Sequence, residues 1–467
     1  MKIEILKKKI RKFSKLISYK QDLELNKKHS RDWRNRYSNI SLGVIFPKTT
    51  KELSKIIKFA QKENIKLIPQ GGNTGLVGGT SPFQNKKEII INFEKLNKII
   101  DIDKDNNCVE VESGIIIDNL ALELKKYGYL FPLNMSSTGS SQVGGAIATN
   151  AGGINVVKYG SIRNNILGLE VVLSNGEILN IGSRLIKDNT GYNLKDIFCG
   201  SEGTLGFITK AIIKIYPIPK DDINCFIAFE NFSEVIKTYN LIYKSFRDNI
   251  DSLEFISQLS FDLCIKHKLI KKSFFNKKYK YYLLIKFTFF DHKDNFLEKF
   301  YYTLENFSNN YKEFLIAQNE DQKLQFWNFR ELLTEAQKIE GKLIGFDISL
   351  PINFMGEFMH KVKKEVNYIV PKTKFHVFGH LGDSNLHFNL IEPDNLKNNF
   401  YDYEKQIKSI INKYLKLFKG SVSAEHGIGL LKKDDLLHTK SKAELRIMKK
   451  IKKLFDPKNI FNQKKII

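Results

Sequence analysis

The sequence predicts a protein of mixed helices and strands, α+β or α/β, built from two or three domains. Its 467 residues exceed what one ordinary hydrophobic core accommodates. Glycines are dense from Gly71 to Gly206, and this density ends at the segment 217–219, which reads Pro-Ile-Pro and indicates a domain boundary. A hydrophobic fraction of 42% is sufficient to bury the cores of such domains.

The glycine-rich half begins with a β-α-β pattern. Residues 42–46 predict a short strand, and residues 65–68 predict a second one. Between them, Thr49 and Glu52 have the spacing of a capping box. The helix that follows shows its apolar stripe at Leu53, Ile56, Ile57 and Ala60. This opening is typical of an α/β or α+β domain.

The second half is richer in phenylalanine, tyrosine and lysine. Residues 281–290 predict a strand, and residues 326–340 predict a helix that ends near Gly341. No internal repeat is visible. At the other end of the chain, the helical spacing of Ile3, Leu6 and Ile10 predicts a basic surface helix.

Composition excludes several classes of protein. No run of about 18 apolar residues predicts a membrane span, and the N-terminus lacks the apolar core of a secretory signal, so we expect a cytoplasmic location, peripheral to the inner membrane face as an alternative. The net charge of +24 is spread along the chain without a nucleic-acid module, so solvated lysines are the simpler interpretation. Widely spaced cysteines predict buried, reduced thiols at Cys108, Cys199, Cys225 and Cys264.

Three glycine segments, Pro69–Gly79, Ser136–Gly153 and Gly200–Thr209, suggest a nucleotide site. Glycine lets backbone N–H groups approach an anion closely, because no Cβ intrudes, and a pyrophosphate suits such a loop. The order of glycines matches neither the Rossmann nor the Walker pattern, and a single segment could be a tight turn. Three of them within one stretch of chain are hard to explain as turns alone.

Histidines and a carboxylate gather in the last quarter of the chain. His380 and His387 flank a turn of Gly-Asp-Ser-Asn between two strand-like segments, and that turn can bring them together. Two neutral imidazoles with one carboxylate suit Zn²⁺ with an open coordination position, although structural histidines at strand ends are also common. His387 and Asn389 share one face of a strand. On the predicted helix 326–340, Arg330 and Thr334 lie four residues apart on one face.

These segments resemble the FAD domain of the vanillyl-alcohol oxidase and p-cresol methylhydroxylase superfamily. Within it they are similar to the D-2-hydroxy acid branch, which includes D-2-hydroxyglutarate dehydrogenase, FAD-linked D-lactate dehydrogenase and the glycolate oxidase flavin subunit. The resemblance runs from Asp32 to Asn462. It implies an α+β fold in which a two-subdomain FAD-binding domain of the p-cresol methylhydroxylase type carries an α+β, ferredoxin-like substrate cap domain. The implied divisions are an N-terminal helical segment, the FAD domain, the cap domain and a tail returning to the FAD domain, at residues 1–37, 38–219, 220–445 and 446–467.

The resemblance also implies the residues that bind FAD. The first glycine segment contains no histidine or cysteine, which such families use for covalent attachment, so we expect FAD to be bound non-covalently. The implied FAD contacts are Pro69, Gly71, Gly72, Asn73, Thr74, Gly75, Leu76, Ser136, Thr138, Gly139, Ser140, Gly144, Gly145, Thr149, Asn150, Gly152, Gly153, Tyr159, Gly160, Glu202, Gly203, Gly206, Ile208 and Asn462.

The implied reaction is oxidation of a D-2-hydroxy acid to the 2-oxo acid, with hydride passing to flavin N5. The implied ligands of Zn²⁺ or another divalent metal are His380, His387 and Glu425, and His426 matches the catalytic base. The implied substrate contacts are Arg330, Thr334 and Asn389, whereas His376 has no such role and is interpreted as structural. Expected partners are an electron acceptor, such as an electron-transfer flavoprotein or a quinone, and a second copy of the chain. The alternatives are a flavin subunit of a glycolate-oxidase-like electron-transfer complex and an oxidase.

Two positions depart from the family pattern. Gly345 stands where members that oxidise D-2-hydroxyglutarate commonly carry a lysine that holds the distal carboxylate, and Lys342 is the alternative source of that charge. We therefore expect a weaker preference for this dicarboxylate, with D-lactate competitive. In the tail, Gln463 and Lys464 replace Pro-Gly, and because Asn462 is kept we expect only a small local change.

Overall fold

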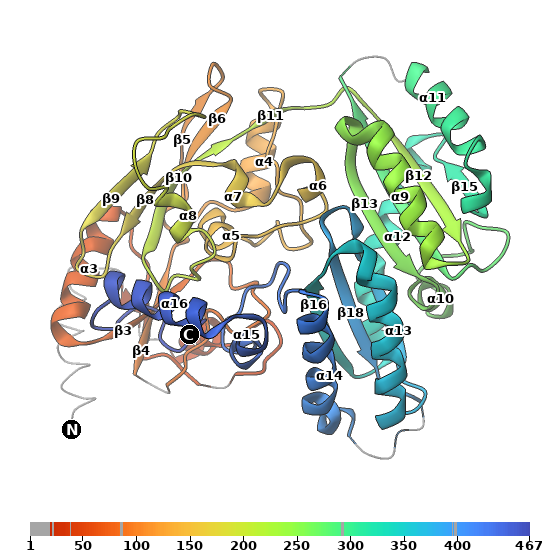
Figure 1. Cartoon of the computed structure of the whole chain (residues 1–467). Coiled ribbons are helices and arrows are strands. Elements are labelled where there is room, and N and C mark those ends of the chain that lie inside the picture. The colour runs from red at the N-terminus through yellow and green to blue at the C-terminus, as the bar shows by residue number, and fades with distance from the viewer. Residues whose placement is uncertain are drawn as a thin grey trace. The chain divides into compact units, whose positions relative to one another are not determined.

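The structure, a computed structural model, describes residues 19–20, 23–37, 39–84, 87–290, 294–394, 396 and 399–467 (Figure 1). The predicted helix around Ile3, Leu6 and Ile10 lies outside the described residues. The chain forms two compact units. The first comprises Met1–Gly152, Gly160–Ile218 and Glu425–Ile467, and the second comprises Gly153–Tyr159 and Pro219–Ala424. Within the described part of the chain, no helix is both long and apolar enough to cross a membrane.

The first unit opens with a four-stranded sheet that follows the predicted β-α-β pattern. Its order is β1 (Tyr19–Lys20), β2 (Gly43–Ile45), β4 (Glu88–Asn92) and β3 (Lys66–Gln70), with β2 and β3 both parallel to β4. Helix α3 (Thr50–Glu63) connects β2 to β3, and α2 (Leu23–Ser30) precedes β2. The Thr49 hydroxyl accepts the N–H of Glu52, whose carboxylate accepts the N–H of Lys48. The predicted stripe of α3 is buried at Leu53, Ile56, Ile57 and Ala60.

A second, antiparallel sheet completes the first unit. Its order is β5 (Ile99–Asp103), β6 (Cys108–Glu112), β10 (Phe207–Lys214), β8 (Ile166–Val172) and β9 (Ile178–Gly182). Strands β7 (Tyr129–Leu130) and β11 (Tyr216–Pro217) form a separate pair. The helices between these strands are α4 (Ile117–Lys125), α5 (Val143–Thr149), α7 (Ile162–Asn165) and α8 (Lys195–Phe198). Leu120 of α4 and Ile147 of α5 are buried against the apolar face of this sheet.

The C-terminal tail packs within the first unit. It contains α15 (Lys433–Thr439) and α16 (Lys442–Phe455). Phe455 contacts the ring of Phe198 edge to face, at 5.3 Å between centroids, and Phe461 stacks on Phe207 at 4.2 Å. The second unit ends at Ala424, so α15 and α16 both belong to the first unit.

The second unit is built on a seven-stranded sheet in which every neighbouring pair of strands is antiparallel. The order is β15 (Glu313–Ile316), β12 (Asp221–Phe229), β14 (Tyr281–Phe289), β13 (Ile250–Ser257), β17 (Lys374–His380), β18 (Asn385–Ile391) and β16 (Leu343–Ser349). The predicted strand at 281–290 is therefore confirmed as β14. Its sequence is almost continuously apolar because helices pack on both faces of the sheet and bury its side chains.

The connections repeat one motif twice. In the first half, β12, α9 (Phe232–Phe246), β13, β14, α11 (Asp294–Glu305) and β15 follow the β-α-β-β-α-β order of a ferredoxin-like fold. The second half repeats it without the final strand, as β16, α13 (Ile352–Ile369), β17, β18 and α14 (Glu404–Leu417). The halves join where β13 pairs with β17. The predicted ferredoxin-like cap is thus confirmed, and it contains a repeat of topology that the residues themselves do not display.

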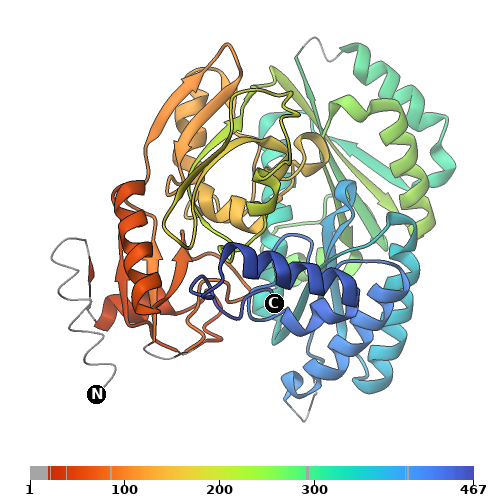
Figure 2. The ribbon, with the colours of Figure 1, turned by 60° about the vertical axis from the view of Figure 1, so that its left-hand side comes forward.

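The two faces of this sheet carry different helices (Figure 2). On one face, Phe232 of α9 contacts Phe255 and Phe358 of α13 contacts Phe388. The opposite face is covered by α10 (Gln258–Lys266) and α12 (Glu320–Glu340), which ends at Gly341 as predicted. Alternation along each strand directs Glu254, Phe378, His380, His387 and Asn389 to the α12 face.

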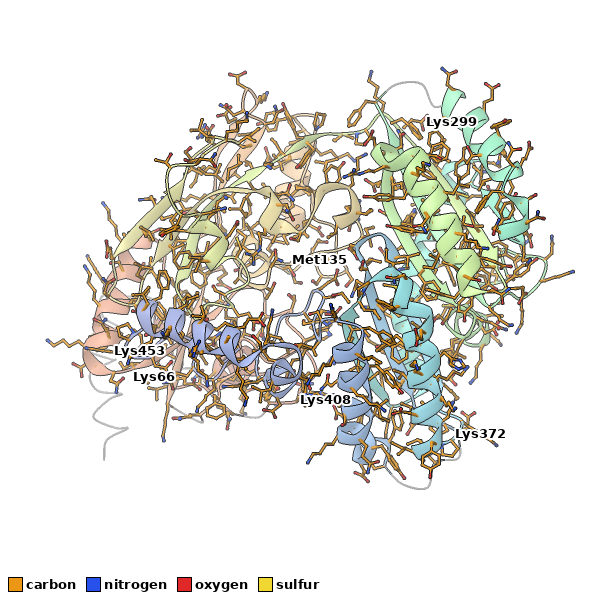
Figure 3. All side chains as sticks on the ribbon, in the orientation of Figure 1. Lys66, Met135, Lys299, Lys372, Lys408 and Lys453 are labelled. Atoms are coloured by element: carbon orange, nitrogen blue, oxygen red, sulfur yellow. The ribbon has the colours of Figure 1, made fainter. Side chains whose placement is uncertain are left out.

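The positive charge is dispersed over both units. The lysines labelled in Figure 3 come from β3, α11, α14, α16 and the segment between α13 and β17. This distribution agrees with solvated lysines. The four cysteines are all buried and free, as predicted.

Candidate functional site: a nucleotide cradle and a histidine cluster

The first two glycine segments pack directly against each other in the first unit. A Cβ at Gly72 would lie 1.8 Å from the backbone oxygen of Ser140, so only glycine allows this approach. The hydroxyls of Thr74 and Ser141 are 2.9 Å apart and link the same two segments. The backbone N–H groups from Asn73 to Val77 donate no hydrogen bond to any described residue. Around Gly75 a Cβ would meet no atom within 4 Å. Free N–H groups beside open space fit a bound pyrophosphate.

The third glycine segment and the tail close around the first. A Cβ at Gly203 would lie 2.2 Å from Pro69, and Gly203 has a φ of +66°. The side-chain amide of Asn462 donates to the backbone oxygens of Gly79 and Glu202, at 3.0 and 2.7 Å. Asn462 makes these two contacts with Gln463 and Lys464 following it in the chain. The three segments and the tail converge within one unit, as a single nucleotide site requires.

Helix α5 supplies the remaining FAD candidates of the second segment. It carries Gly144, Gly145 and Thr149, and it ends at Asn150, which has a φ of +51°. The Asn150 side chain accepts from the hydroxyl of Ser161 at 3.0 Å. Elsewhere in this unit, Gly152 follows α5, Gly160 has a φ of +74°, Gly206 precedes β10 and Ile208 is buried in it. Ser136, Thr138, Gly139 and Ser140 lie in the turn before α5.

The segment Gly153–Tyr159, which includes helix α6 (Val156–Tyr159), belongs to the second unit. Asn155 donates to the carboxylate of Asp251 at 2.6 Å, and the Lys158 ammonium donates to the hydroxyl of Thr288. Burial lowers the pKa of Lys158. Two of the candidate flavin contacts, Gly153 and Tyr159, are therefore positioned by the second unit, which was not predicted.

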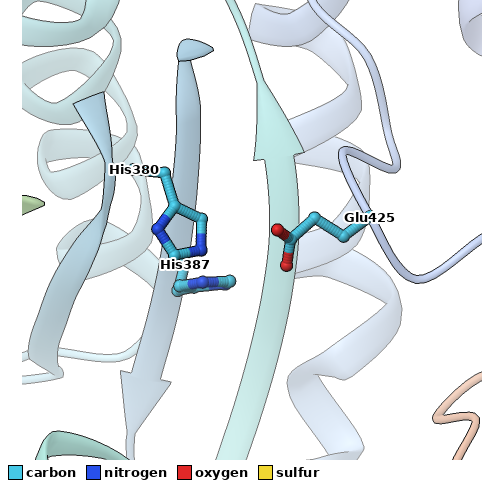
Figure 4. Close-up of side chains that lie close together, drawn as sticks. All are labelled: His380, His387 and Glu425. Carbon is cyan, nitrogen blue, oxygen red and sulfur yellow. The ribbon is translucent and has the colours of Figure 1, made fainter. Parts of the chain in front are cut away.

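The predicted histidine turn forms as β17, a short 3-10 turn (Leu381–Asp383) and β18. It brings the rings of His380 and His387 to 5.2 Å between centroids. Glu425 immediately follows Ala424, the last residue of the second unit. His380, His387 and Glu425 each offer one ligand atom, and these three atoms lie within 4.8 Å of one another (Figure 4). A second group meeting the same limit consists of Asp347, Glu425 and His426. The residues expected to bind a metal are thus assembled.

A buried carboxylate that the sequence did not single out supports this cluster. Glu254 of β13 is fully buried and lies directly opposite His380 of β17. One carboxylate oxygen is 2.5 Å from His380 Nδ1, and the other accepts from Arg330 Nε at 2.5 Å. Burial opposes its charge, but Arg330 and His380 outweigh burial and lower the pKa of Glu254 to about 2. An acid inside the apolar strand 253–256 was the signal that could have revealed it.

The candidate substrate contacts come from α12 and from the sheet face that α12 covers. Arg330 and Thr334 are one turn apart on α12. Arg330 is buried with its guanidinium 4.7 Å from the Phe378 ring centroid, whereas Thr334 is exposed. Asn389 donates to Gln337 of α12 at 2.8 Å. Gly345 pairs with Asn389 across β16 and β18.

Lys342, the alternative source of positive charge, and His376, the histidine interpreted as structural, both have defined surroundings. The Lys342 ammonium lies 3.7 Å from the Glu392 carboxylate, so it already has an anionic partner. His376 is fully buried, and burial lowers its pKa to about 3, so this imidazole is neutral near pH 7. A neutral, enclosed ring agrees with the structural role expected for His376.

Comparison with known proteins identifies the class of this chain. The FAD binding domain model matches residues 41–182, and the model for the C-terminal domain of FAD linked oxidases matches residues 218–466, more than half of the chain. The protein therefore belongs to the family of FAD-linked oxidases, as the glycine segments suggested.

Individual relatives within this family show which enzymes the chain is similar to. The chain is 32% identical to the mitochondrial D-2-hydroxyglutarate dehydrogenase of Arabidopsis thaliana, over 96% of this chain and 78% of the relative. It is also 32% identical to the D-2-hydroxyglutarate–pyruvate transhydrogenase of Saccharomyces cerevisiae, over 94% of this chain and 89% of the relative. Among solved structures, p-cresol methylhydroxylase matches with a TM-score of 0.75 at 14% identity, over 98% of this chain and 96% of that one. The last likeness confirms the predicted fold of the FAD domain.

Proposed function

We propose that this protein is an FAD-dependent dehydrogenase that oxidises a D-2-hydroxy acid to the 2-oxo acid. The observation that carries the proposal is the convergence of His380, His387 and Glu425, with His426 next in the chain. The FAD-linked family supplies the hydride acceptor, and two relatives are named for their action on D-2-hydroxyglutarate. When bound, FAD accepts the hydride from the carbon that carries the hydroxyl.

We propose that the cluster holds a divalent cation, with zinc as the first choice. Two imidazole nitrogens and one carboxylate oxygen are a typical donor set for a catalytic zinc, and they leave a coordination position open. A cation there would polarise the substrate hydroxyl and lower its pKa. His426 then needs only to accept the hydroxyl proton, the ordinary task of a general base.

The α12 face of the cap offers groups that suit the substrate carboxylate. Among the described residues, no acceptor takes the two terminal nitrogens of Arg330, because only its Nε donates, to Glu254. A guanidinium with both terminal nitrogens available matches a carboxylate in a bidentate manner. We propose that Arg330, with Thr334 one turn further along α12 and Asn389 on the sheet face that α12 covers, orients the acid for reaction.

Gly345 bears on whether the substrate carries a second carboxylate. A lysine is missing at this position, and Lys342 is engaged with Glu392. We therefore propose a weaker preference for D-2-hydroxyglutarate than its relatives' names suggest, with D-lactate competitive. The non-covalent state of FAD, the electron acceptor, a homodimer and the cytoplasmic location stay predictions.

Metal removal tests the proposal. Treatment with EDTA should abolish D-2-hydroxy acid oxidation while the protein keeps its flavin absorbance, and added Zn²⁺ or another divalent ion should restore turnover. A His387→Gln variant should bind less metal and not respond to added zinc. Fully active protein in which elemental analysis finds no divalent metal would exclude the proposed role of the cluster.

A further inference from the structure

We propose that Glu254 is the positioning residue of this site: it fixes which nitrogen of His380 faces the metal and directs the guanidinium of Arg330 toward the substrate. The inference rests on the proposed function and deepens it. It concerns a residue that neither the sequence motifs nor the relatives' names single out.

The fold places Glu254 where it can act on both partners. It lies in register opposite His380 where β13 meets β17, the junction of the two ferredoxin-like halves. It is on the face covered by α12, from which Arg330 reaches it. Glu254 is 0% exposed and His380 is 6% exposed, so water does not compete for these hydrogen bonds. Each carboxylate oxygen has a different partner.

The chemistry of a carboxylate then decides the state of the imidazole. An ionised carboxylate only accepts hydrogen bonds, so His380 must carry its proton on Nδ1. That assignment leaves the lone pair on Nε2, the nitrogen that remains to bind a cation. A carboxylate behind a ligating histidine also holds the ring orientation and raises the basicity of the ligand. Without Glu254, this carboxylate no longer holds the proton of the neutral ring on Nδ1.

The same carboxylate orients Arg330. Only Nε is hydrogen-bonded to Glu254, so the two terminal nitrogens can donate to another acceptor, and the guanidinium lies over the Phe378 ring at 4.7 Å. Two fixed contacts define the plane of the guanidinium, which a bidentate carboxylate contact requires. Glu254 therefore links the metal ligand and the substrate contact through one buried anion.

The test replaces Glu254 by glutamine, which has nearly the same shape. The amide cannot accept from both partners, since one of its two positions becomes a donor. We expect Glu254→Gln to keep its FAD but to bind Zn²⁺ about 10- to 100-fold more weakly in competition with a chelator, the usual cost of losing such a partner. We also expect a raised KM for the hydroxy acid. A zinc affinity equal to that of the wild-type protein would overturn the inference.

Glu340→Gln is the matched control. Glu340 is also a buried carboxylate of the second unit, with its side chain 2% exposed, and it accepts from His267, Lys266 and Lys374. Glu340→Gln also removes one buried negative charge and its hydrogen bonds, but Glu340 contacts Lys374 at the start of β17, whereas His380 lies at its end. The control should therefore leave zinc affinity and KM unchanged. An equal loss of zinc in both variants would show a general structural effect and overturn the inference.

A third variant separates this inference from the proposed function. If His380→Gln binds zinc as well as the wild-type protein does, then the proposed metal site is wrong. If His380→Gln loses zinc and Glu254→Gln does not, only the role of Glu254 is wrong. Should Glu254→Gln fail to fold, ¹⁵N spectra of histidine in the metal-free wild-type protein provide the test. The account predicts a proton on His380 Nδ1, and a proton on Nε2 would overturn it.

Discussion

Alanine substitutions at Gly72 and Gly75 separate the structural role of the first glycine segment from its proposed role in binding FAD. A Cβ at Gly72 would lie 1.8 Å from the Ser140 oxygen, so the two segments would have to separate by about 1 Å in Gly72→Ala. Overpacking of this kind costs about 1–3 kcal/mol. A Cβ at Gly75 would meet nothing within 4 Å, and Gly75 lacks a positive φ. Gly75→Ala should therefore stabilise the FAD-free protein by roughly 0.4–1 kcal/mol, through reduced freedom of the unfolded chain.

The two variants should respond differently to FAD. In Gly75→Ala the added methyl group takes the space that we assign to the pyrophosphate, so FAD affinity should fall at least roughly tenfold, or about 1.4 kcal/mol. Gly72→Ala should lose both stability and FAD. Urea unfolding of the FAD-free proteins and titration with FAD measure the two effects. If Gly75→Ala binds FAD as the wild-type protein does, the assignment of the cradle is refuted.

Three other changes test separate parts of the account. The pKa of His376 is lowered to about 3 in the folded protein, against 6.5 when unfolded, so its stabilising contribution is present above pH 6.5 and is lost as the pH falls. The unfolding free energy of the wild-type protein should thus fall about 1.4 kcal/mol per pH unit more steeply than that of His376→Phe below pH 6.5, and equal slopes in urea unfolding would contradict this. His426→Ala should retain FAD and metal but lose about 10²–10⁴-fold in kcat, and near-normal kcat would exclude this residue as the base. Gly345→Lys should raise the kcat/KM ratio of D-2-hydroxyglutarate to D-lactate by about 10- to 100-fold, since a charge-assisted hydrogen bond contributes about 1.5–3 kcal/mol. The Gly345→Lys substitution requires a small shift of Asn389, whose Oδ1 would lie 2.8 Å from the new Cβ. An unchanged ratio of the two kcat/KM values would show that position 345 does not set specificity.

Local features of the fold could be predicted because their causes are local. The cap of α3 follows from the spacing of Thr49 and Glu52, and its buried stripe follows from helical periodicity. The approach of His380 and His387 follows from a turn between two strands that pair directly. In each case, the residues that determine the structure lie within a few positions of one another.

Long-range features could not be predicted in the same way. Glu254 and His380 are 126 residues apart, and they meet only because β13 pairs with β17 in one particular register. That pairing depends on how two ferredoxin-like halves share a sheet, which no short pattern encodes. The membership of Gly153–Tyr159 in the second unit likewise depends on the distant partners Asp251 and Thr288. Residues that act through such partners carry no motif.

Anaerobic reduction of the bound flavin tests the central claim most directly. The purified protein, loaded with FAD and a divalent metal, is mixed without oxygen with D-lactate, D-2-hydroxybutyrate or D-2-hydroxyglutarate, and with the L-enantiomers as controls. The account predicts that D-acids bleach the flavin absorbance and release one 2-oxo acid per flavin, whereas the L-acids do not. Flavin that stays oxidised with all three D-acids would contradict the proposed function.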